Sequence, residues 1–152
     1  MKLEEAIKQT KFKNEHHKLL LNVIYAAGVI HAQQTRFFKV YDISPQQYNV
    51  LRILRGQQPN PASVGLVQER MLDQMSNASR LIEKLKLKGL LTRRECKQDR
   101  RQVDIVISEK GLSLLEAIDK EFGGFENNLA NLSVGESKTL NDLLDKLTEK
   151  LN

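Results

Sequence analysis

The sequence of 152 residues contains one cysteine, no tryptophan and only three prolines. The lone Cys96 excludes an internal disulfide and any zinc finger built on cysteines. The most apolar stretch, residues 19–32, is shorter than the ~20 residues that a membrane-spanning helix needs, and Asn22 and His31 interrupt it. The N-terminal residues include acids and lack the apolar core of a secretion signal, so we expect a cytoplasmic protein with no membrane partner.

Catalytic and metal-binding patterns are also missing from the sequence. It has no phosphate-cradling glycine loop and no Ser or Cys with a matching His partner. His16 and His17 would point about 100° apart on a helix, so they do not easily share one metal ion. His31 lies in an apolar segment, where a core or interface role is the commoner one. We therefore expect no enzyme, no metal site and no cofactor.

The positive charge of the sequence is concentrated in one segment. From Arg80 to Arg101, nine Lys or Arg residues stand against three acidic residues, which makes this segment +6. Since the whole chain carries +5, the remaining residues carry −1. Charge grouped in this way suits a polyanion such as DNA. The alternative is a solvated basic surface, and composition alone does not choose between the two.

Hydrophobic periodicity and capping residues predict a mainly helical chain. A first helix over about 14–39 is apolar most of the way round, which predicts burial from two sides, the second of them by another subunit. Ser44, followed by Pro45 and Gln47, predicts the start of a second helix that stops at Gly56. The residues expected to be buried on this helix are Tyr48, Leu51, Ile53 and Leu54.

Two more helices and a hairpin are predicted next along the chain. Ser63 should cap a third helix, and a fourth should run from about 74–76 to Gly89, because glycine suits the end of a helix. Alternating apolar residues predict strands over 90–95 and 102–107, joined by a turn. Three compact helices followed by a basic hairpin define a winged helix-turn-helix, in which one helix enters the major groove of DNA and the hairpin lies beside it.

The last part of the chain is again predicted to be helical. Ser108 should cap a fifth helix, which Gly123 and Gly124 should weaken or bend. Ser133 and Glu136 form the pattern of a capping box, which predicts the start of a final helix.

The predicted fold class is therefore mainly α with a small β-hairpin. We expect a single domain over 1–152, with a winged helix-turn-helix DNA-binding core at 44–107. The helices at 1–40 and 109–152 lie outside this core, and we expect them to be the dimerisation helices.

The start of the fourth helix carries the candidate base-reading residues. On a helix over 76–88 the apolar side chains share one face and anchor the helix, which leaves polar side chains on the other side. The anchoring residues are Ala78, Leu81, Ile82 and Leu85, and the outward ones are Ser76, Ser79, Arg80, Glu83 and Lys84, with Asn77 on the flank. The expected base-reading residues are Ser76, Asn77 and Arg80, of which Arg80 suits guanine and Asn77 suits adenine by bidentate geometry. The alternative is an ordinary amphipathic surface helix capped by Ser76.

The predicted turn of the hairpin carries a second group of DNA-binding candidates. Asp99 can pair with a neighbouring arginine and hold its planar group, which leaves the other of Arg100 and Arg101 for a narrow, electronegative minor groove. Lys97 suits a phosphate contact, which carries no sequence information. The alternative is a turn whose charges only keep the protein in solution.

These residues resemble the MarR (multiple-antibiotic-resistance) family of transcriptional regulators. The resemblance lies in MSNASRLIEKLKLKGLLTRRECKQDRRQVDIVISEKGLSLL, above all in Lys88-Gly89-Leu90, in Asp99-Arg100-Arg101 and in the strand that enters a Ser-capped helix before Gly111. It implies an obligate homodimer with interleaved terminal helices, and repression at a pseudopalindromic double-stranded DNA operator. In many members a small phenolic or other amphipathic effector releases the DNA.

The resemblance also implies roles for particular residues. Ser76, Asn77 and Arg80 meet the major groove, and Arg100 or Arg101 enters the minor groove; of these two we favour Arg101. One departure from the family pattern is Gly65, which weakens the start of the third helix.

Three questions stay open at this point. Cys96 has basic neighbours, which favour a reactive thiolate, so oxidant sensing is an alternative to an incidental exposed thiol. An effector pocket would lie between the first helix and the core, although aromatic residues there usually belong to the core. Its conceivable lining is Tyr25, His31, Phe37, Phe38 and Tyr48. The alternative function is a winged-helix module for protein contact or for non-specific, architectural DNA binding.

Overall fold

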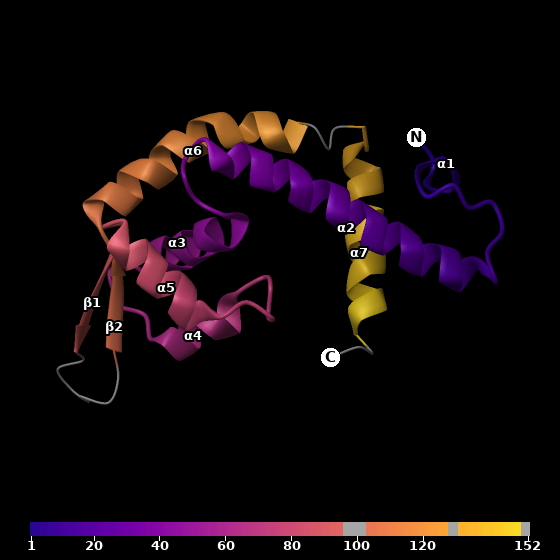
Figure 1. The fold of residues 1–152 in the computed structure, drawn as a ribbon. Helices are drawn as coiled ribbons and strands as arrows, with labels where there is room; N and C mark the ends of the chain where they lie inside the picture. The colour runs from indigo at the N-terminus through magenta and orange to yellow at the C-terminus, as the bar shows by residue number, and fades with distance from the viewer. Residues whose placement is uncertain (96–102, 128–130, 150–152) are drawn as a thin grey trace. The chain divides into compact units, whose positions relative to one another are not determined.

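The computed structural model describes residues 1–95, 103–127 and 131–149 (Figure 1). Its elements are, in order, α1 (Leu3–Ala6), α2 (Glu15–Lys39), α3 (Pro45–Gln57), α4 (Val64–Arg70), α5 (Ala78–Leu87), β1 (Leu91–Glu95), β2 (Val103–Ile107), α6 (Glu109–Asn127) and α7 (Val134–Thr148). The chain forms two compact units, Met1–Leu115 and Glu116–Asn152. The predicted fold class, mainly helical with one two-stranded hairpin, is confirmed.

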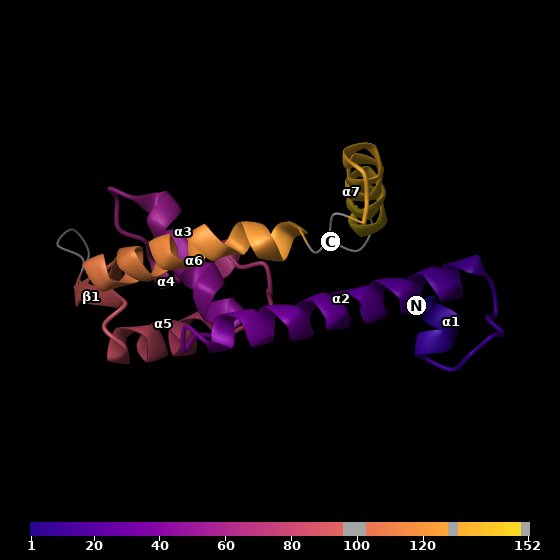
Figure 2. The same ribbon diagram turned by 90° about the horizontal axis from the view of Figure 1, so that it is seen from above.

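The core of the first unit lies among α3, α4, α5 and the hairpin, which Figures 1 and 2 show close together. Each element contributes side chains that are almost completely buried: Val50, Leu51, Leu54, Val67, Ile82, Leu85, Leu91 and Ile105. Full burial of one such side chain stabilises the fold by about 1.5–3 kcal/mol. The three helices and the hairpin therefore form one packed winged helix-turn-helix.

The hairpin is joined to the helical core through its second strand. β1 and β2 are antiparallel, and their register runs from Leu91 opposite Ile107 to Glu95 opposite Val103. Ala62, in the connection between α3 and α4, forms two backbone hydrogen bonds with Ile105, at 2.9 and 2.8 Å. Backbone bonds as well as apolar side chains therefore set the position of the wing.

Most helices begin where the capping residues predict. Asn14 caps α2 and Ser63 caps α4, each by accepting a hydrogen bond from a backbone N–H three residues on. Ser44 and Ser133 open α3 and α7 with complete capping boxes. The Ser108 hydroxyl oxygen accepts from the backbone N–H three residues on at 3.1 Å, which caps α6. These predictions are confirmed.

The glycines inside the helices do not end them. α6 continues through Gly123 and Gly124, α4 includes Gly65, and α3 extends one residue past Gly56. A glycine inside a helix costs about 1 kcal/mol relative to alanine but keeps its backbone donor, so the surrounding turns continue. By contrast, Gly89 follows α5 with a φ of 71°, the left-handed conformation predicted for a helix end.

The buried face of α3 differs in part from the prediction. Leu51 and Leu54 are buried as expected, but Tyr48 and Ile53 are only half-buried. Val50 and Gln47 occupy the remaining buried positions. The buried stripe follows positions 47, 50, 51 and 54, the spacing of a single helix face, and this leaves residue 53 at its edge. The predicted buried face, which included Tyr48 and Ile53, is therefore rotated about the helix axis relative to the observed face, which includes Gln47 and Val50.

The N-terminal part of the first unit contains one helix that was not predicted. α1 buries Leu3, and Glu4 pairs with Lys18 of α2 at 2.5 Å. The hydrogen bond from Lys18 lowers the pKa of Glu4. On α2, Phe38 is the buried residue, whereas Leu19 and others of its apolar residues are exposed. The predicted burial of α2 from two sides is therefore not reached among the described residues of the first unit.

None of the helices in the described ranges is long and apolar enough to cross a membrane. Within the same ranges, no group of three or more His, Cys, Asp or Glu side chains is arranged to hold a metal ion.

Candidate nucleic-acid interface

The turn between α4 and α5 explains why α5 begins later than predicted. The Asp73 carboxylate accepts hydrogen bonds from the Ser76 hydroxyl at 2.8 Å and from the Met75 backbone N–H at 3.1 Å. Such side-chain bonds to nearby groups compete with helix formation, and here they hold 73–76 as a turn. The helix begins at Ala78, and its cap is Asn77 rather than Ser76.

The same hydrogen bonds stabilise the ionised form of Asp73. The bond from the Ser76 hydroxyl is the largest influence that lowers the pKa of Asp73, and the bond from the Met75 backbone lowers it further. Burial is the second-largest influence and raises the pKa of Asp73, whereas Gln46 and His31 lower it further, so that the net direction is down. The turn is therefore most stable when Asp73 carries its charge.

Side chains from both neighbouring helices hold the two ends of this turn. Asn49 of α3 accepts a hydrogen bond from the backbone N–H of Leu72 at 2.9 Å. Gln68 of α4 accepts one from the N–H of Ala78 at 3.0 Å. Sequence reasoning missed Asn49 and Gln68, because amide side chains are common on helices and nothing local marks these two. Their contacts fix where α5 starts relative to α3 and α4.

α5 buries one face and exposes the other, as predicted. Ala78, Ile82 and Leu85 are buried, and Leu81 is half-buried. The candidates Ser79, Arg80 and Lys84 are exposed. The exposed candidates thus lie in the first two turns of a helix whose other face is anchored in the core.

Ser76 and Asn77 have structural contacts of their own at the start of α5. The Ser76 hydroxyl donates to Asp73, and the amide oxygen of Asn77 accepts the backbone N–H of Arg80 at 3.0 Å. A bidentate contact between Asn77 and adenine uses that same oxygen. Arg80, whose side chain is exposed, is therefore the base-reading candidate with the fewest competing contacts.

The described residues of the basic segment differ in their partners. Lys86 and Arg93 both approach Glu83, at 3.5 and 3.4 Å, and the second of these pairs joins α5 to β1. Arg80 and Lys84 form no ion pair with any residue in the described part of the chain. These two side chains have charges available to an external anion.

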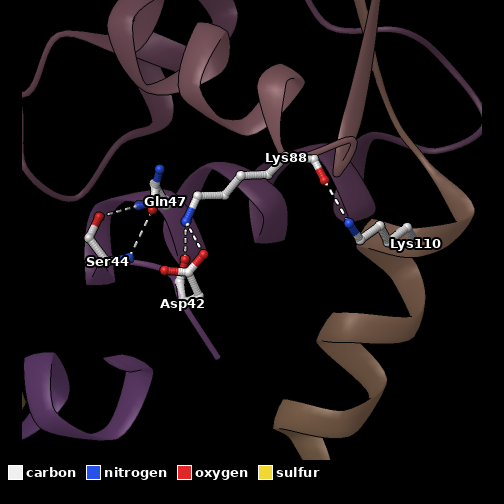
Figure 3. Close-up of polar contacts among 5 residues, drawn as sticks. All are labelled: Asp42, Ser44, Gln47, Lys88 and Lys110. Atoms are coloured by element: carbon white, nitrogen blue, oxygen red, sulfur yellow. Dashed lines mark hydrogen bonds and ion pairs between the residues drawn. The ribbon is translucent and has the colours of Figure 1, made fainter. Parts of the chain in front are cut away.

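Lys88 is directed toward the connection between α2 and α3 (Figure 3). Its ammonium group contacts the Asp42 carboxylate at 2.9 Å and also donates to the Asp42 carbonyl oxygen. On the other side, Lys110 at the start of α6 donates to the carbonyl oxygen of Lys88 at 2.8 Å. The capping box of Ser44 and Gln47 begins α3 close by. The end of α5 is thus tied to the two segments that flank the winged helix-turn-helix, the α2–α3 connection and the start of α6.

The candidates of the predicted turn fall outside the described residues. They are Lys97, Asp99, Arg100 and Arg101, together with Cys96. β1 and β2, which flank them, are in place, so the position of the wing is described although its turn is not. The roles of these residues stay predictions.

Aromatic residues gather where α2 meets α3. The rings of Phe38 and Tyr48 stack with centroids 4.4 Å apart, and Phe37 contacts Phe38 and Tyr41 at 5.1 and 5.7 Å. Phe38 is fully buried, which is what a core residue requires. Tyr25 and His31, the other two residues named for an effector pocket, are exposed.

Comparison with known proteins connects this geometry to a family. The sequence model of the MarR family matches residues 41–102, from the α2–α3 connection into the hairpin. A MarR transcription factor from Planctomyces limnophilus is 26% identical, with a TM-score of 0.67 over 89% of this chain and 98% of that one. No curated protein matches the sequence.

Two further solved structures share the fold. MepR of S. aureus, solved as a complex with DNA, is 21% identical with a TM-score of 0.74, over 87% of this chain and 95% of that one. BpsR of Bordetella bronchiseptica, whose DNA binding is regulated by 6-hydroxynicotinic acid, is 22% identical with a TM-score of 0.66, over 84% of this chain and 98% of that one.

The packed helices α3, α4 and α5 and the anchored hairpin define a winged helix-turn-helix protein. Residues 41–102 match the model of the MarR family of transcriptional regulators, and the fold is similar over most of the chain to a MarR transcription factor. The resemblance seen in the sequence is confirmed.

Proposed function

We propose that this protein is a sequence-specific DNA-binding regulator that represses transcription as a homodimer at a pseudopalindromic operator. α5 enters the major groove, where Arg80 reads guanine and Lys84 meets a phosphate. Ser76, Asn77 and Ser79 border the same groove, and Lys97, Asp99, Arg100 and Arg101 form the contact of the wing. The observation that carries the proposal is the exposed Arg80 at the start of a helix whose opposite face is buried.

The DNA-bound structure of MepR supports this docking mode. Its fold matches this chain with a TM-score of 0.74. In a winged helix-turn-helix the N-terminal residues of the recognition helix reach base edges. Arg80 and Lys84 occupy the first two turns of α5 and have no ion-pair partner among the described residues. Both charges are thus available to DNA without breaking a contact of the fold.

Apolar residues on the outer helices support the homodimer. Exposed apolar side chains occur on α2 and α7: Leu19, Leu20, Ile24, Val29, Ile30, Leu140, Leu143, Leu144 and Leu147. Soluble monomers rarely leave many large apolar groups exposed together on one element. A second copy that covers these helices removes them from water. The segments 1–40 and 109–152 are thus the proposed dimerisation helices.

We propose further that a small amphipathic or phenolic effector releases the DNA. The support is the regulation of DNA binding in BpsR by 6-hydroxynicotinic acid, together with the shared fold. Phe37 and Tyr48, which are half-buried beside the buried Phe38, lie close to the winged helix-turn-helix and can offer an effector aromatic surface. A panel of small phenols, added to a preformed complex with labelled DNA, tests this part of the proposal by release of the label.

A second candidate function is architectural DNA binding without sequence preference. It is favoured by the exposed Lys84, since a phosphate contact carries no sequence information. Base reading by Arg80 is the feature that separates the two functions.

Titration of labelled DNA separates them directly. The probe is DNA from upstream of the protein's own gene, with a scrambled duplex as the matched control, at ~150 mM salt. A specific regulator binds the first at nanomolar concentration and the second at least ~10³-fold more weakly. Equal binding to both, with a steep dependence on salt, supports the architectural function. If neither duplex binds, and no sequence is selected from a random pool, the proposed function is wrong.

A further inference from the structure

We propose that Lys88 is a positioning residue for the recognition helix α5: it acts through Asp42 and does not contact DNA phosphates. This inference rests on the proposed DNA-binding function and deepens it. It assigns to one residue of the basic segment a role opposite to the one that its charge suggests.

The contacts of the ammonium group are the first support. Lys88 lies directly after α5, and its ammonium group meets both the carboxylate and the carbonyl oxygen of Asp42. An ammonium group has three donors, and two of them are thus used on one residue. The Lys88 side chain is 32% exposed, in contrast to the fully external position expected of a lysine that meets a phosphate. Lys88 therefore connects two parts of the fold.

The backbone of Asp42 is the second support. Asp42 has a φ of 55°, in the left-handed region that residues with a Cβ atom rarely adopt. Asp is among the residues that tolerate this conformation best. In it, the carboxylate and the carbonyl oxygen of Asp42 meet the same ammonium group. The connection that follows α2 is thus shaped to hold the end of α5.

The third support is that the backbone at the end of α5 is also bonded to the start of α6. Lys110 donates to the Lys88 carbonyl oxygen at 2.8 Å, and the Ser108 hydroxyl donates to the Gly89 carbonyl oxygen at 2.7 Å. The end of α5 is therefore held between the α2–α3 connection and the start of α6. A displacement of the C-terminal end of α2 reaches α5 through Asp42, and this links the proposed dimerisation helix to the proposed reading helix.

Lys84 provides a matched comparison on the same helix. It lies one turn before Lys88, it is exposed, and it pairs with no acidic residue in the described part of the chain. A lysine that neutralises a phosphate releases counterions, so its loss reduces the salt dependence of binding by about one unit of slope. A positioning residue leaves that slope unchanged. The slope thus distinguishes the two roles.

The experiment measures operator affinity across a series of salt concentrations for Lys88→Gln, Asp42→Asn, the double variant and Lys84→Gln. The operator is the duplex that the wild-type protein binds specifically. We expect Lys88→Gln and Asp42→Asn each to weaken binding about two- to fivefold, the range that an exposed ion pair can supply, and the double variant to be no weaker than either. Lys84→Gln lowers the salt slope, and the other three variants retain it.

Asp42→Asn is the most informative of these variants. It removes a negative charge near the basic segment, so simple attraction between protein and DNA predicts tighter binding, whereas loss of positioning predicts weaker binding. Asparagine also tolerates the left-handed conformation, so the backbone at residue 42 is retained. A stoichiometric titration of each variant measures the fraction that binds DNA and separates weaker binding from loss of folded protein.

Two results overturn the inference. One is a salt slope that falls for Lys88→Gln as it does for Lys84→Gln. The other is unchanged or tighter binding by Asp42→Asn. Either result, with Lys84→Gln behaving as expected, leaves the proposed DNA-binding function intact. Absence of specific binding by the wild-type protein overturns both.

Discussion

At the scale of single residues, the side chains around the start of α5 divide between holding the helix and facing outward. Asp73, Ser76 and Asn77 bond to one another or to the backbone, and these bonds determine where the helix begins. Arg80 and Lys84 point outward and have no acidic partner in the described ranges. A positive charge in a basic segment is thus not by itself a DNA contact, and each residue has to be tested for its own role.

Replacement of Arg80 by alanine tests base reading. Loss of a bidentate contact with guanine costs about 1–3 kcal/mol on the operator and reduces the preference over scrambled DNA. Lys84→Ala is the control on the same helix, since loss of a phosphate contact weakens both duplexes alike. Labelled-DNA titration of both variants measures the ratio of affinities. Equal losses on the two duplexes for Arg80→Ala contradict base reading. In the wing, Lys97→Ala tests a phosphate contact, and it should weaken binding to both duplexes alike.

The charge of Asp73 makes the stability of the turn depend on pH. Hydrogen bonds, above all from Ser76, lower the pKa of Asp73 from 3.8, so its ionised form is favoured in the folded state. A lowered pKa contributes stability that is fully present above the unfolded value and is lost as pH falls through the folded one. We expect the wild-type protein to be more stable than Asp73→Asn at pH 7, and this difference to shrink as pH falls below about 4. Urea unfolding of both proteins at several pH values measures it, and a difference that is constant with pH contradicts the assignment.

At the scale of elements, α5 is held at several points along its length. Its first residue is bonded to Gln68 of α4, and the turn before it is bonded to Asn49 of α3. Glu83 in its middle pairs with Arg93 of β1, and Lys88 at its end pairs with Asp42. The buried face adds apolar contact between these points. α5 therefore has a defined orientation relative to the wing, and the proposed bidentate base contact requires such an orientation.

Gly111 tests how closely α6 approaches the hairpin. A Cβ atom added at this position would lie 2.2 Å from the Leu90 carbonyl oxygen and 2.7 Å from the Ile107 side chain. Since the carbonyl belongs to the backbone and cannot turn away, Gly111→Ala should lower the free energy of unfolding by about 1–3 kcal/mol. Gly56→Ala is the control, because the space around Gly56 is open, and it should be neutral or stabilise by up to ~1 kcal/mol. Chemical denaturation compares them, and equal stabilities exclude the close approach.

At the scale of the whole molecule, each of the two compact units has exposed apolar side chains among its described residues. α2 and α7 expose leucine and isoleucine side chains, although α7 opens with a complete capping box and is a well-formed helix. The proposed homodimer would cover these apolar residues. It would also fit the proposed pseudopalindromic operator, because two copies of α5 would meet two half-sites about 34 Å apart.

Replacement of Leu143 by glutamate tests the dimer. The Leu143 side chain is 57% exposed in the single chain, so a charge there should leave the fold of the chain intact. In a dimer interface the same charge has to be buried without a partner, which favours the monomer. Sedimentation at micromolar concentration should show a dimer for the wild-type protein and a monomer for Leu143→Glu, with weaker operator binding. Lys146→Glu, a charge change on the same helix, is the control. A wild-type monomer contradicts the proposal.

The sequence by itself determined the local features of this protein. Helix starts at Ser44, Ser63 and Ser133 follow from side chains that bond to a backbone group three residues away, and such bonds need no other part of the chain. The left-handed end at Gly89 is equally local. The alternation of apolar residues in β2 and the motifs around Lys88-Gly89-Leu90 were enough to predict the hairpin and the family.

Only the tertiary structure decided which residues meet across the chain. The attachment of the turn before α5 to α3 and α4 depends on Asn49 and Gln68, and the partner of Lys88 is 46 residues away in the sequence. No local pattern marks such pairs, because a side chain selects its partner only after the helices have packed. For the same reason, charge along the sequence grouped Lys84 with Lys88, whereas folding directs one toward solvent and ties the other to Asp42.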